Sequence, residues 1–341
     1  MQDLLSYDLN GLRTLLESWG EPAFRAKQLV EWLWQRDAGS YDEMTNLPAA
    51  LRERLAAEAP LQRAVVAEHR EARDRTRKYL LRFSDGVAVE TVGIPGSGRA
   101  ERLTVCVSSQ AGCAMGCVFC ATGQAGLQRD LTSGEIAEQV RIVGEDFGQK
   151  VTNVVVMGQG EPFANYDATL GALRLLNSKD ALNIGARHLT VSTSGILTGI
   201  TRLASEPEQF RLAVSLHAAT QELRDRLMPG LSGQPLEGLR EALVDYHARS
   251  GRRVSLEYML LKGTNDHESD LRALVDFARS VPPAHINLLP YNDTGVTGMR
   301  AEDATRTAAA AEYLRAAGIE TSVRRSRGSE IAAACGQLAG A

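Results

Sequence analysis

From Leu103 onward, short runs of branched apolar residues alternate with longer stretches of helical periodicity. This alternation predicts βαβ units, and hence an α/β fold with a parallel sheet or barrel. One predicted helix follows the capping-box sequence Thr132-Ser-Gly-Glu135, and another begins after Pro235. The predicted strands are Leu103–Val107, Asn153–Met157, His188–Val191, Arg211–Leu216, Arg253–Met259, His285–Leu289 and Ile319–Val323.

Residues 1–62 predict a small helical accessory domain before this core. Asp8 suits the first position of a helix that Gly20 ends, and helical periodicity continues through Ala23–Gln35 and Pro48–Ala59.

Residues 63–100 predict a β-hairpin and linker region, and residues 101–341 the core domain. Between Arg63 and Arg82 there are seven basic and three acidic residues, although the whole chain carries a net charge of −4. A solvated hairpin face and an RNA-facing surface both fit this pattern. The candidates for phosphate contacts are the residues from Arg70 to Lys78, with Arg324, Arg325 and Arg327.

No stretch of the 341 residues is apolar for long enough to span a membrane, and the first residues lack the basic start of a signal peptide. We therefore expect a cytoplasmic protein. In a reducing compartment, clustered cysteines indicate metal binding or catalysis rather than structural disulfides.

Three of the five cysteines, Cys113, Cys117 and Cys120, follow the first predicted core strand at the spacing C-x₃-C-x₂-C. Thiolates are soft ligands, and three on one loop can bind one soft-metal centre. Zinc and iron–sulfur sites normally take four protein ligands, so a triplet leaves one position open. A zinc loop or three unrelated cysteines are the alternatives. The spacing resembles the signature of radical S-adenosylmethionine (SAM) enzymes, in which three cysteines hold a 4Fe–4S cluster and SAM binds the fourth iron.

Polar residues follow several later strands. Gly158-Gln-Gly160-Glu161 is by itself only a turn, but after the cysteine loop it resembles the glycine–glutamate motif that holds the SAM amino group. A single Ser or His at a strand end is usually a local hydrogen-bonding residue. Several at one rim predict a ligand-binding mouth; here they are Ser192, Ser215, His217, Asn287 and Asn292.

The remaining cysteines, Cys106 and Cys335, lie in Val105-Cys106-Val-Ser-Ser-Gln-Ala-Gly-Cys113 and Ala334-Cys335-Gly-Gln-Leu338. With the cluster loop, Ser192-Thr-Ser-Gly195 and Ser215-Leu-His217-Ala, these segments resemble the RlmN/Cfr family of RNA adenine methyltransferases over nearly the whole chain. The resemblance implies a radical SAM partial (β/α)₆ barrel with an N-terminal helical domain. It is closer to the branch that methylates adenine C2 in ribosomal RNA than to the C8-methylating branch.

The resemblance also implies a role for individual residues. Cys113, Cys117 and Cys120 would ligate the cluster, Cys335 would carry a methyl group, Cys106 would resolve a covalent intermediate, and Glu90 would accept a proton. The implied SAM-contact residues are Phe119, Gly160, Glu161, Ser192, Ser215, Leu216, His217 and Asn292.

The implied reaction uses two SAM molecules per turnover. The first methylates Cys335, and the second yields a 5′-deoxyadenosyl radical that takes a hydrogen atom from the S-methyl group. The carbon radical adds to adenine C2, and Cys106 then attacks the Cys335 sulfur and releases the methylated RNA. The implied partners are 23S rRNA near the peptidyl-transferase centre and an electron donor such as flavodoxin or ferredoxin, with a monomeric enzyme.

The resemblance leaves open whether the tRNA adenosine beside the anticodon is also a substrate. Methylation at C8 is the first alternative. A radical SAM activase or mutase is disfavoured because it has no need for the Cys106 and Cys335 pair. A zinc-dependent RNA-binding module is disfavoured by the missing fourth ligand near the triplet.

Overall fold

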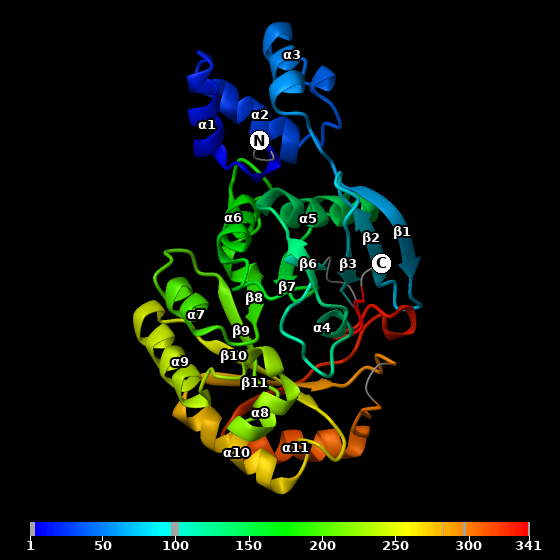
Figure 1. Cartoon of the computed structure of the whole chain (residues 1–341), viewed down its shortest axis with the longest axis vertical. Coiled ribbons are helices and arrows are strands. Elements are labelled where there is room, and N and C mark those ends of the chain that lie inside the picture. Colours follow the sequence, from blue (N-terminus) through cyan, green and yellow to red (C-terminus); the bar gives the residue numbers. More distant parts are fainter. Residues whose placement is uncertain (1–3, 97–101, 282, 296–297, 340–341) are drawn as a thin grey trace.

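The computed structural model describes residues 4–96, 102–281, 283–295 and 298–339, which form a small and a large lobe (Figure 1). The small lobe contains the three helices predicted from the sequence. The side chain of Asp8 caps the first of them, since it accepts a hydrogen bond of 2.7 Å from the N–H of Gly11. The elements of this lobe are η1 (Leu4–Ser6), α1 (Leu9–Ser18), α2 (Phe24–Trp34), η2 (Tyr41–Glu43) and α3 (Ala49–Glu58).

A buried carboxylate fixes the small lobe to the large one. Glu138 lies on α5 (Ser133–Phe147), and its side chain is 1% exposed. It pairs with Arg63 and with Arg141, whose Nε lies 2.7 Å from it, and Arg141 also pairs with Asp37 of the small lobe. Breaking such a pair would leave a buried charge uncompensated, so the network holds the lobes in one arrangement.

The large lobe is built on one sheet of ten strands in the order β1-β2-β3-β4-β7-β8-β9-β10-β11-β12. From β4 onward the pairing is parallel, and β1, β2 and β3 are antiparallel to their neighbours. In the described part of the chain the two ends of the sheet do not pair, which agrees with the predicted partial barrel. The strands are β1 (Val65–Glu71), β2 (Arg77–Arg82), β3 (Ala88–Pro95), β4 (Leu103–Val107), β7 (Asn153–Val156), β8 (Leu189–Thr193), β9 (Arg211–Ser215), β10 (Val254–Leu260), β11 (Ala284–Pro290) and β12 (Glu320–Val323).

Helices between the parallel strands cover the outside of the sheet (Figure 1). The predicted capping box of α5 is present, since the N–H of Thr132 donates to Glu135 at 2.8 Å and the N–H of Glu135 donates to Thr132 at 3.2 Å. Apolar side chains from both lobes form one continuous core. The other helices of this layer are α6 (Tyr166–Asn177), α7 (Leu197–Ala204), α9 (Leu236–Ser250), α10 (Glu268–Ser280) and α11 (Ala304–Ala316). Helix α8 (Gln221–Leu227) lies instead beside the cysteine loop, where Leu223 and Leu227 pack with Phe119.

Three strands of the structure were not predicted from the sequence. All seven residues of β1 are exposed, so this edge strand lacks the apolar alternation that marks a half-buried strand. The short strands β5 (Gln110–Gly112) and β6 (Leu127–Asp130) form a hairpin on either side of the cysteine loop. The predicted hairpin region continues the core sheet, because β3 pairs with β4. The predicted boundary between residues 100 and 101 lies outside the described residues.

After β12 the chain folds back against the antiparallel strands as a C-terminal segment, residues 324–339, which is red in Figure 1. Arg327 pairs with Asp74 at 2.6 Å, and the Lys78 ammonium donates to the carbonyl of Ala332 at 3.2 Å. The N–H of Ala339 donates to Glu90 at 2.8 Å. The segment that carries Cys335 is thus tied to the hairpin region at several points.

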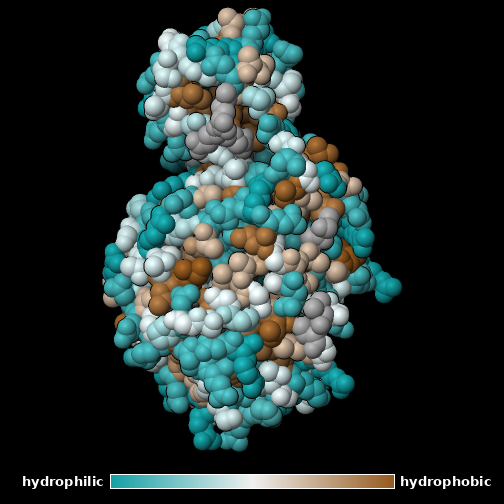
Figure 2. All heavy atoms as spheres, viewed as in Figure 1, coloured by the Kyte–Doolittle hydropathy of each residue, from teal (hydrophilic) through white to brown (hydrophobic). Residues whose placement is uncertain are grey.

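On the face shown in Figure 2, hydrophobic residues are scattered among hydrophilic ones and form no single broad patch. None of the described helices is both long and apolar enough to cross a membrane.

Candidate active site

A cavity of about 580 Å³ lies where the parallel strands end, as expected for this kind of sheet. Its walls come from loops that follow almost every parallel strand and from the C-terminal segment. Leu216, Glu90 and Asn287 are the predicted site residues that do not line it. Those that do are Cys106, Cys113, Cys117, Phe119, Cys120, Gly160, Glu161, Ser192, Ser215, His217, Asn292 and Cys335.

Backbone hydrogen bonds hold the cysteine loop between β5 and helix α4 (Ala121–Ala125). The N–H of Val118 donates to Leu227 at 3.0 Å, and the N–H of Cys120 donates to Cys117 at 3.1 Å. The loop begins at Gly112, which has a φ of +77°, and a Cβ there would lie 1.9 Å from the carbonyl oxygen of Gly126. Only glycine fits at this position.

The loop presents its three thiols to the cavity, but the free thiolates would be unstable there. Burial and, less strongly, the nearby Glu161 raise the pKa of Cys113 to about 11. Burial and the neighbouring thiols Cys120 and Cys113 also raise the pKa of Cys117. A cation bound to the sulfur atoms would remove this penalty, because metal coordination deprotonates a thiol.

The arrangement of the thiols bears on which metal group fits. Cys113, Cys117 and Cys120 all line one cavity. Three soft thiolate ligands with one ligand position left open suit a 4Fe–4S cluster.

Glu161 is a buried carboxylate, 3% exposed, at the turn after β7. It accepts hydrogen bonds from the N–H of Ser194 at 2.6 Å, the hydroxyl of Thr193 at 2.7 Å and the N–H of Phe163 at 2.9 Å. Burial nevertheless raises its pKa, and the hydrogen bonds only partly oppose this effect. A bound ammonium group would stabilise the charged form, so Glu161 is suited to the SAM amino group.

His217 and Phe119 form an edge-to-face ring pair with centroids 4.8 Å apart. The Nδ1 atom of His217 accepts from the N–H of Met259 at 3.1 Å. Burial, with a smaller contribution from the Arg224 guanidinium, lowers the pKa of His217 to about 3, so the ring is neutral. Leu216, which directly precedes His217, packs in the core with no exposed surface. Any contact of Leu216 with a ligand would therefore have to come from its backbone.

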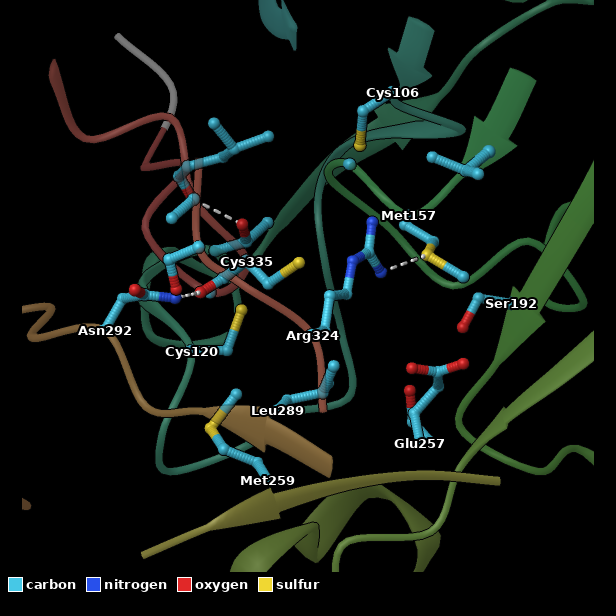
Figure 3. Close-up of a pocket in the computed structure, with 18 of the residues that line it drawn as sticks. Cys106, Cys120, Met157, Ser192, Glu257, Met259, Leu289, Asn292, Arg324 and Cys335 are labelled. Atoms are coloured by element: carbon cyan, nitrogen blue, oxygen red, sulfur yellow. Dashed lines mark hydrogen bonds between the residues drawn. The ribbon is translucent and has the colours of Figure 1, made fainter. Parts of the chain in front are cut away.

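Cys335 lies beside the cysteine loop. Its carbonyl oxygen accepts from the side-chain amide of Asn292 at 3.2 Å (Figure 3). The next residue, Gly336, accepts from the N–H of Ala121 at 2.8 Å, and Leu338 accepts from the hydroxyl of Thr122 at 2.5 Å. These bonds bring the C-terminal thiol to the same cavity as the cluster loop.

Cys106 lies on β4 opposite Val92 of β3 and also faces the cavity. Burial and then the neighbouring Cys335 raise its pKa to about 12, whereas the Arg324 guanidinium acts in the opposite direction. Figure 3 shows the side chains of Cys106, Cys335 and Arg324 directed into one space.

Glu90 lies outside the cavity wall. Its carboxylate is 2.6 Å from the Lys78 ammonium and accepts from the N–H of Ala339 at 2.8 Å. In this structure the predicted proton acceptor therefore holds the C-terminal segment.

The cavity residues that were not predicted from the sequence as site residues include Arg324 and Glu257. Arg324 was assigned to RNA phosphate, but its side chain points into the cavity. Glu257 on β10 is 3% exposed, and one oxygen accepts from Asn287 at 2.9 Å while the other has no hydrogen-bond partner. A single carboxylate within the apolar run Val254-Ser-Leu-Glu-Tyr-Met-Leu was the available signal.

Two family models match the chain. Residues 107–277 match the radical SAM superfamily, and residues 2–61 match the ribosomal RNA large subunit methyltransferase N-terminal domain.

Whole proteins also match the chain over nearly its full length. The chain is 46% identical to a protein of Gemmatimonas aurantiaca over 99% of its own length and 93% of the relative's. It is 48% identical to a protein of Gloeobacter violaceus over 98% of its own length and 94% of the relative's. Both relatives are named "Probable dual-specificity RNA methyltransferase RlmN". The crystal structure of a radical SAM methyltransferase from Sphaerobacter thermophilus superimposes with a TM-score of 0.93 at 42% identity, covering 99% of each chain. The chain therefore belongs to the radical SAM superfamily and, within it, to the RlmN family of methyltransferases.

Proposed function

We propose that this protein methylates C2 of an adenosine in RNA through an S-methylated Cys335. The observation that supports this most strongly is that all five cysteines of the chain line one cavity. Three of them account for a cluster. The other two, Cys106 and Cys335, suit a route in which one thiol carries the methyl group and the other frees the product.

The chemistry of adenine explains why a carrier is needed. C2 is an electron-poor sp² carbon, so it cannot displace a methyl group from SAM directly. A 4Fe–4S cluster with SAM supplies, when bound, a 5′-deoxyadenosyl radical that activates the methyl group. Cys113, Cys117 and Cys120 would hold the cluster. The residues proposed to hold SAM are Phe119, Gly160, Glu161, Ser192, Ser215, Leu216, His217 and Asn292.

The two remaining cysteines make and break the bonds to the protein. The Cys335 thiolate takes a methyl group from a first SAM molecule: a sulfur–carbon bond forms, and S-adenosylhomocysteine leaves. Once that carbon is bonded to adenine, and one electron and the ring proton have left the adduct, the Cys106 thiolate attacks the Cys335 sulfur. A disulfide forms, the sulfur–carbon bond breaks, and its electron pair goes to the carbon, which takes a proton.

Glu90 is the proposed acceptor of the ring proton. Its carboxylate is paired with Lys78 and bonded to Ala339, so these contacts must open before it can reach the substrate. The reaction is proposed to couple proton removal to movement of the C-terminal segment.

The proposed substrates are an adenosine of 23S rRNA near the peptidyl-transferase centre and the adenosine on the 3′ side of the tRNA anticodon. The name of the matching N-terminal family model supports the first, and the dual specificity in the relatives' names supports the second. Reduced flavodoxin or ferredoxin is the proposed electron donor.

Nucleoside analysis tests the proposal. Reduced, anaerobically purified enzyme and SAM are incubated separately with 23S rRNA and with tRNA, and the digested nucleosides are identified by mass spectrometry. We expect 2-methyladenosine from both, and none with Cys335→Ala. Mainly 8-methyladenosine would assign the protein to the other branch, and no methylated adenosine would refute the proposal.

A further inference from the structure

Arg324 is a cation built into the cavity wall between the two proposed reactive thiols. It directly follows β12, and its N–H donates to the carbonyl of Leu288 at 2.9 Å. Its guanidinium donates to the sulfur of Met157 at 3.6 Å, a bond drawn in Figure 3. The residue is therefore fixed at both its backbone and its side-chain end.

The guanidinium interacts electrostatically with Cys335, Glu257 and Cys106, and Cys335 contributes most to the raised pKa of Arg324. Within the described residues, no carboxylate forms an ion pair with Arg324 at 4.0 Å or less. A guanidinium has five N–H donors, and the single side-chain bond to Met157 leaves others for a ligand or a thiolate in the cavity.

The resolving step needs such a charge. Cys106 must attack as a thiolate, yet it lies in an apolar cluster with Val92, Ala333 and Leu338, which disfavours the charged form. Cys335 makes the thiolate less stable still, and Arg324 is the cation that stabilises it. Lys78 on β2 is not available for this role, because its ammonium already pairs with Glu90 at 2.6 Å.

We infer that Arg324 is a positioning residue that stabilises the Cys106 thiolate and holds it opposite the Cys335 sulfur during the resolving step. This inference rests on the proposed function, and it gives Arg324 a role other than phosphate binding. The proton of Cys106 leaves to solvent or a base, the sulfur–sulfur bond forms, and the Cys335 sulfur–carbon bond breaks as described above.

The first test measures the thiol itself, in holoenzyme without RNA. The rate at which iodoacetamide alkylates Cys106 is followed at pH 8.5 by peptide mass spectrometry, under anaerobic conditions. Each unit by which the pKa of Cys106 rises lowers the thiolate fraction about tenfold, so we expect at least that loss in rate for Arg324→Gln. Arg324→Lys should retain most of the rate. Arg253→Gln removes an exposed charge that pairs with Glu320 at the start of β12, outside the cavity, and should leave the Cys106 rate unchanged.

The second test follows the covalent protein–RNA adduct in a single turnover. With Arg324→Gln the adduct should decay more slowly than in the wild-type enzyme, and raising the pH from 7 to 9 should speed its decay more than in the wild type. Arg324→Lys should restore decay. The inference would be overturned if Cys106 were alkylated and the adduct resolved as fast in Arg324→Gln as in the wild-type enzyme. It would also be overturned if the only effect of Arg324→Gln were weaker RNA binding.

The two tests separate the inference from the function on which it rests. A wild-type enzyme that forms neither adduct nor methylated adenosine would refute the proposed function. The alkylation rates of Cys106 would still decide whether Arg324 controls that thiol, because they need neither RNA nor turnover.

Discussion

The Lys78 ammonium lies 2.6 Å from the Glu90 carboxylate, and their side chains are only 12% and 8% exposed. Replacing Lys78 with Met would leave that carboxylate buried without this cation. We expect the free energy of unfolding in urea to fall by about 3–5 kcal/mol. The double variant Lys78→Met/Glu90→Leu removes both charges and should recover most of the loss.

Glu90→Gln separates the structural role from the catalytic one. The amide oxygen can still accept from the N–H of Ala339, whereas the side chain can no longer take a proton. We expect Cys335 to become methylated but little 2-methyladenosine to form. A Glu90→Gln enzyme with normal product yield would remove Glu90 from the mechanism.

The cysteine loop can be tested by its iron. Wild-type protein purified without oxygen should hold about four iron atoms per protein chain, the content of one cluster. Cys113→Ala, Cys117→Ala or Cys120→Ala should each lose most of the iron and all SAM cleavage, and Cys335→Ala should keep both. Full activity in an iron-free preparation would end the radical proposal.

Cys106→Ala distinguishes a resolving thiol from an apolar filler. Loss of one sulfur atom from the strand should cost little stability. In the proposed reaction, however, Cys335 would stay joined to adenine through a methylene bridge. We expect RNA bound to the protein that survives denaturing electrophoresis, and a nucleotide mass on the Cys335 peptide after nuclease digestion.

The double variant Cys106→Ala/Cys335→Ala serves as the control, since no bridge can form in it. Repeated turnover by Cys106→Ala without an adduct would contradict the proposed mechanism.

His217 should make the protein sensitive to mild acid. Its pKa is lowered from 6.5 to about 3 in the folded chain, so between these values only the unfolded chain takes up the proton. The stabilisation that comes from a neutral His217 is therefore fully present above pH 6.5, and it is lost progressively as the pH falls from 6.5 towards 3. Between pH 7 and pH 5 we expect the wild type to lose about 2 kcal/mol more than His217→Gln, measured by urea unfolding at both pH values. Equal losses would contradict this pKa.

The basic stretch divides into exposed and internally paired residues, which sharpens the predicted RNA contacts. Arg75 is exposed, and Arg73 is 95% exposed with only a loose pair to Glu330 at 3.7 Å, so both are available to phosphate. Arg77, by contrast, pairs with Glu71 and Asp146 at 2.6 and 2.8 Å. Arg73→Gln and Arg75→Gln should each weaken RNA binding and reduce the salt slope by about 1. Arg77→Gln should leave the slope unchanged; equal effects of all three would refute this division.

Much of the fold could be predicted because the core strands are buried and apolar. The predicted range of β4, Leu103–Val107, agrees with the structure, and those of its parallel neighbours agree to within a few residues. The exposed strand β1 could not be predicted, because its pairing with β2 leaves no hydrophobic pattern in the sequence. Its place in the sheet depends on backbone pairing with β2 and on cross-strand contacts such as the Glu71–Arg77 ion pair and the stacking of His69 on Tyr79.

The candidate site was predictable where residues lie close in sequence, as in the cysteine loop. Sequence could not show that Glu90 is bonded to Ala339, 249 positions away, or that Arg324 points inward. Both depend on how the C-terminal segment packs, and no local spacing records that packing.

The C-terminal segment also orders events during synthesis. Its bonds to Asp74 and Glu90 join residues more than two hundred positions apart, so they form only after the end of the chain is made. Domains generally begin folding from the N-terminus. The nascent protein thus has its cysteine loop while the wall that carries Cys335 is still missing.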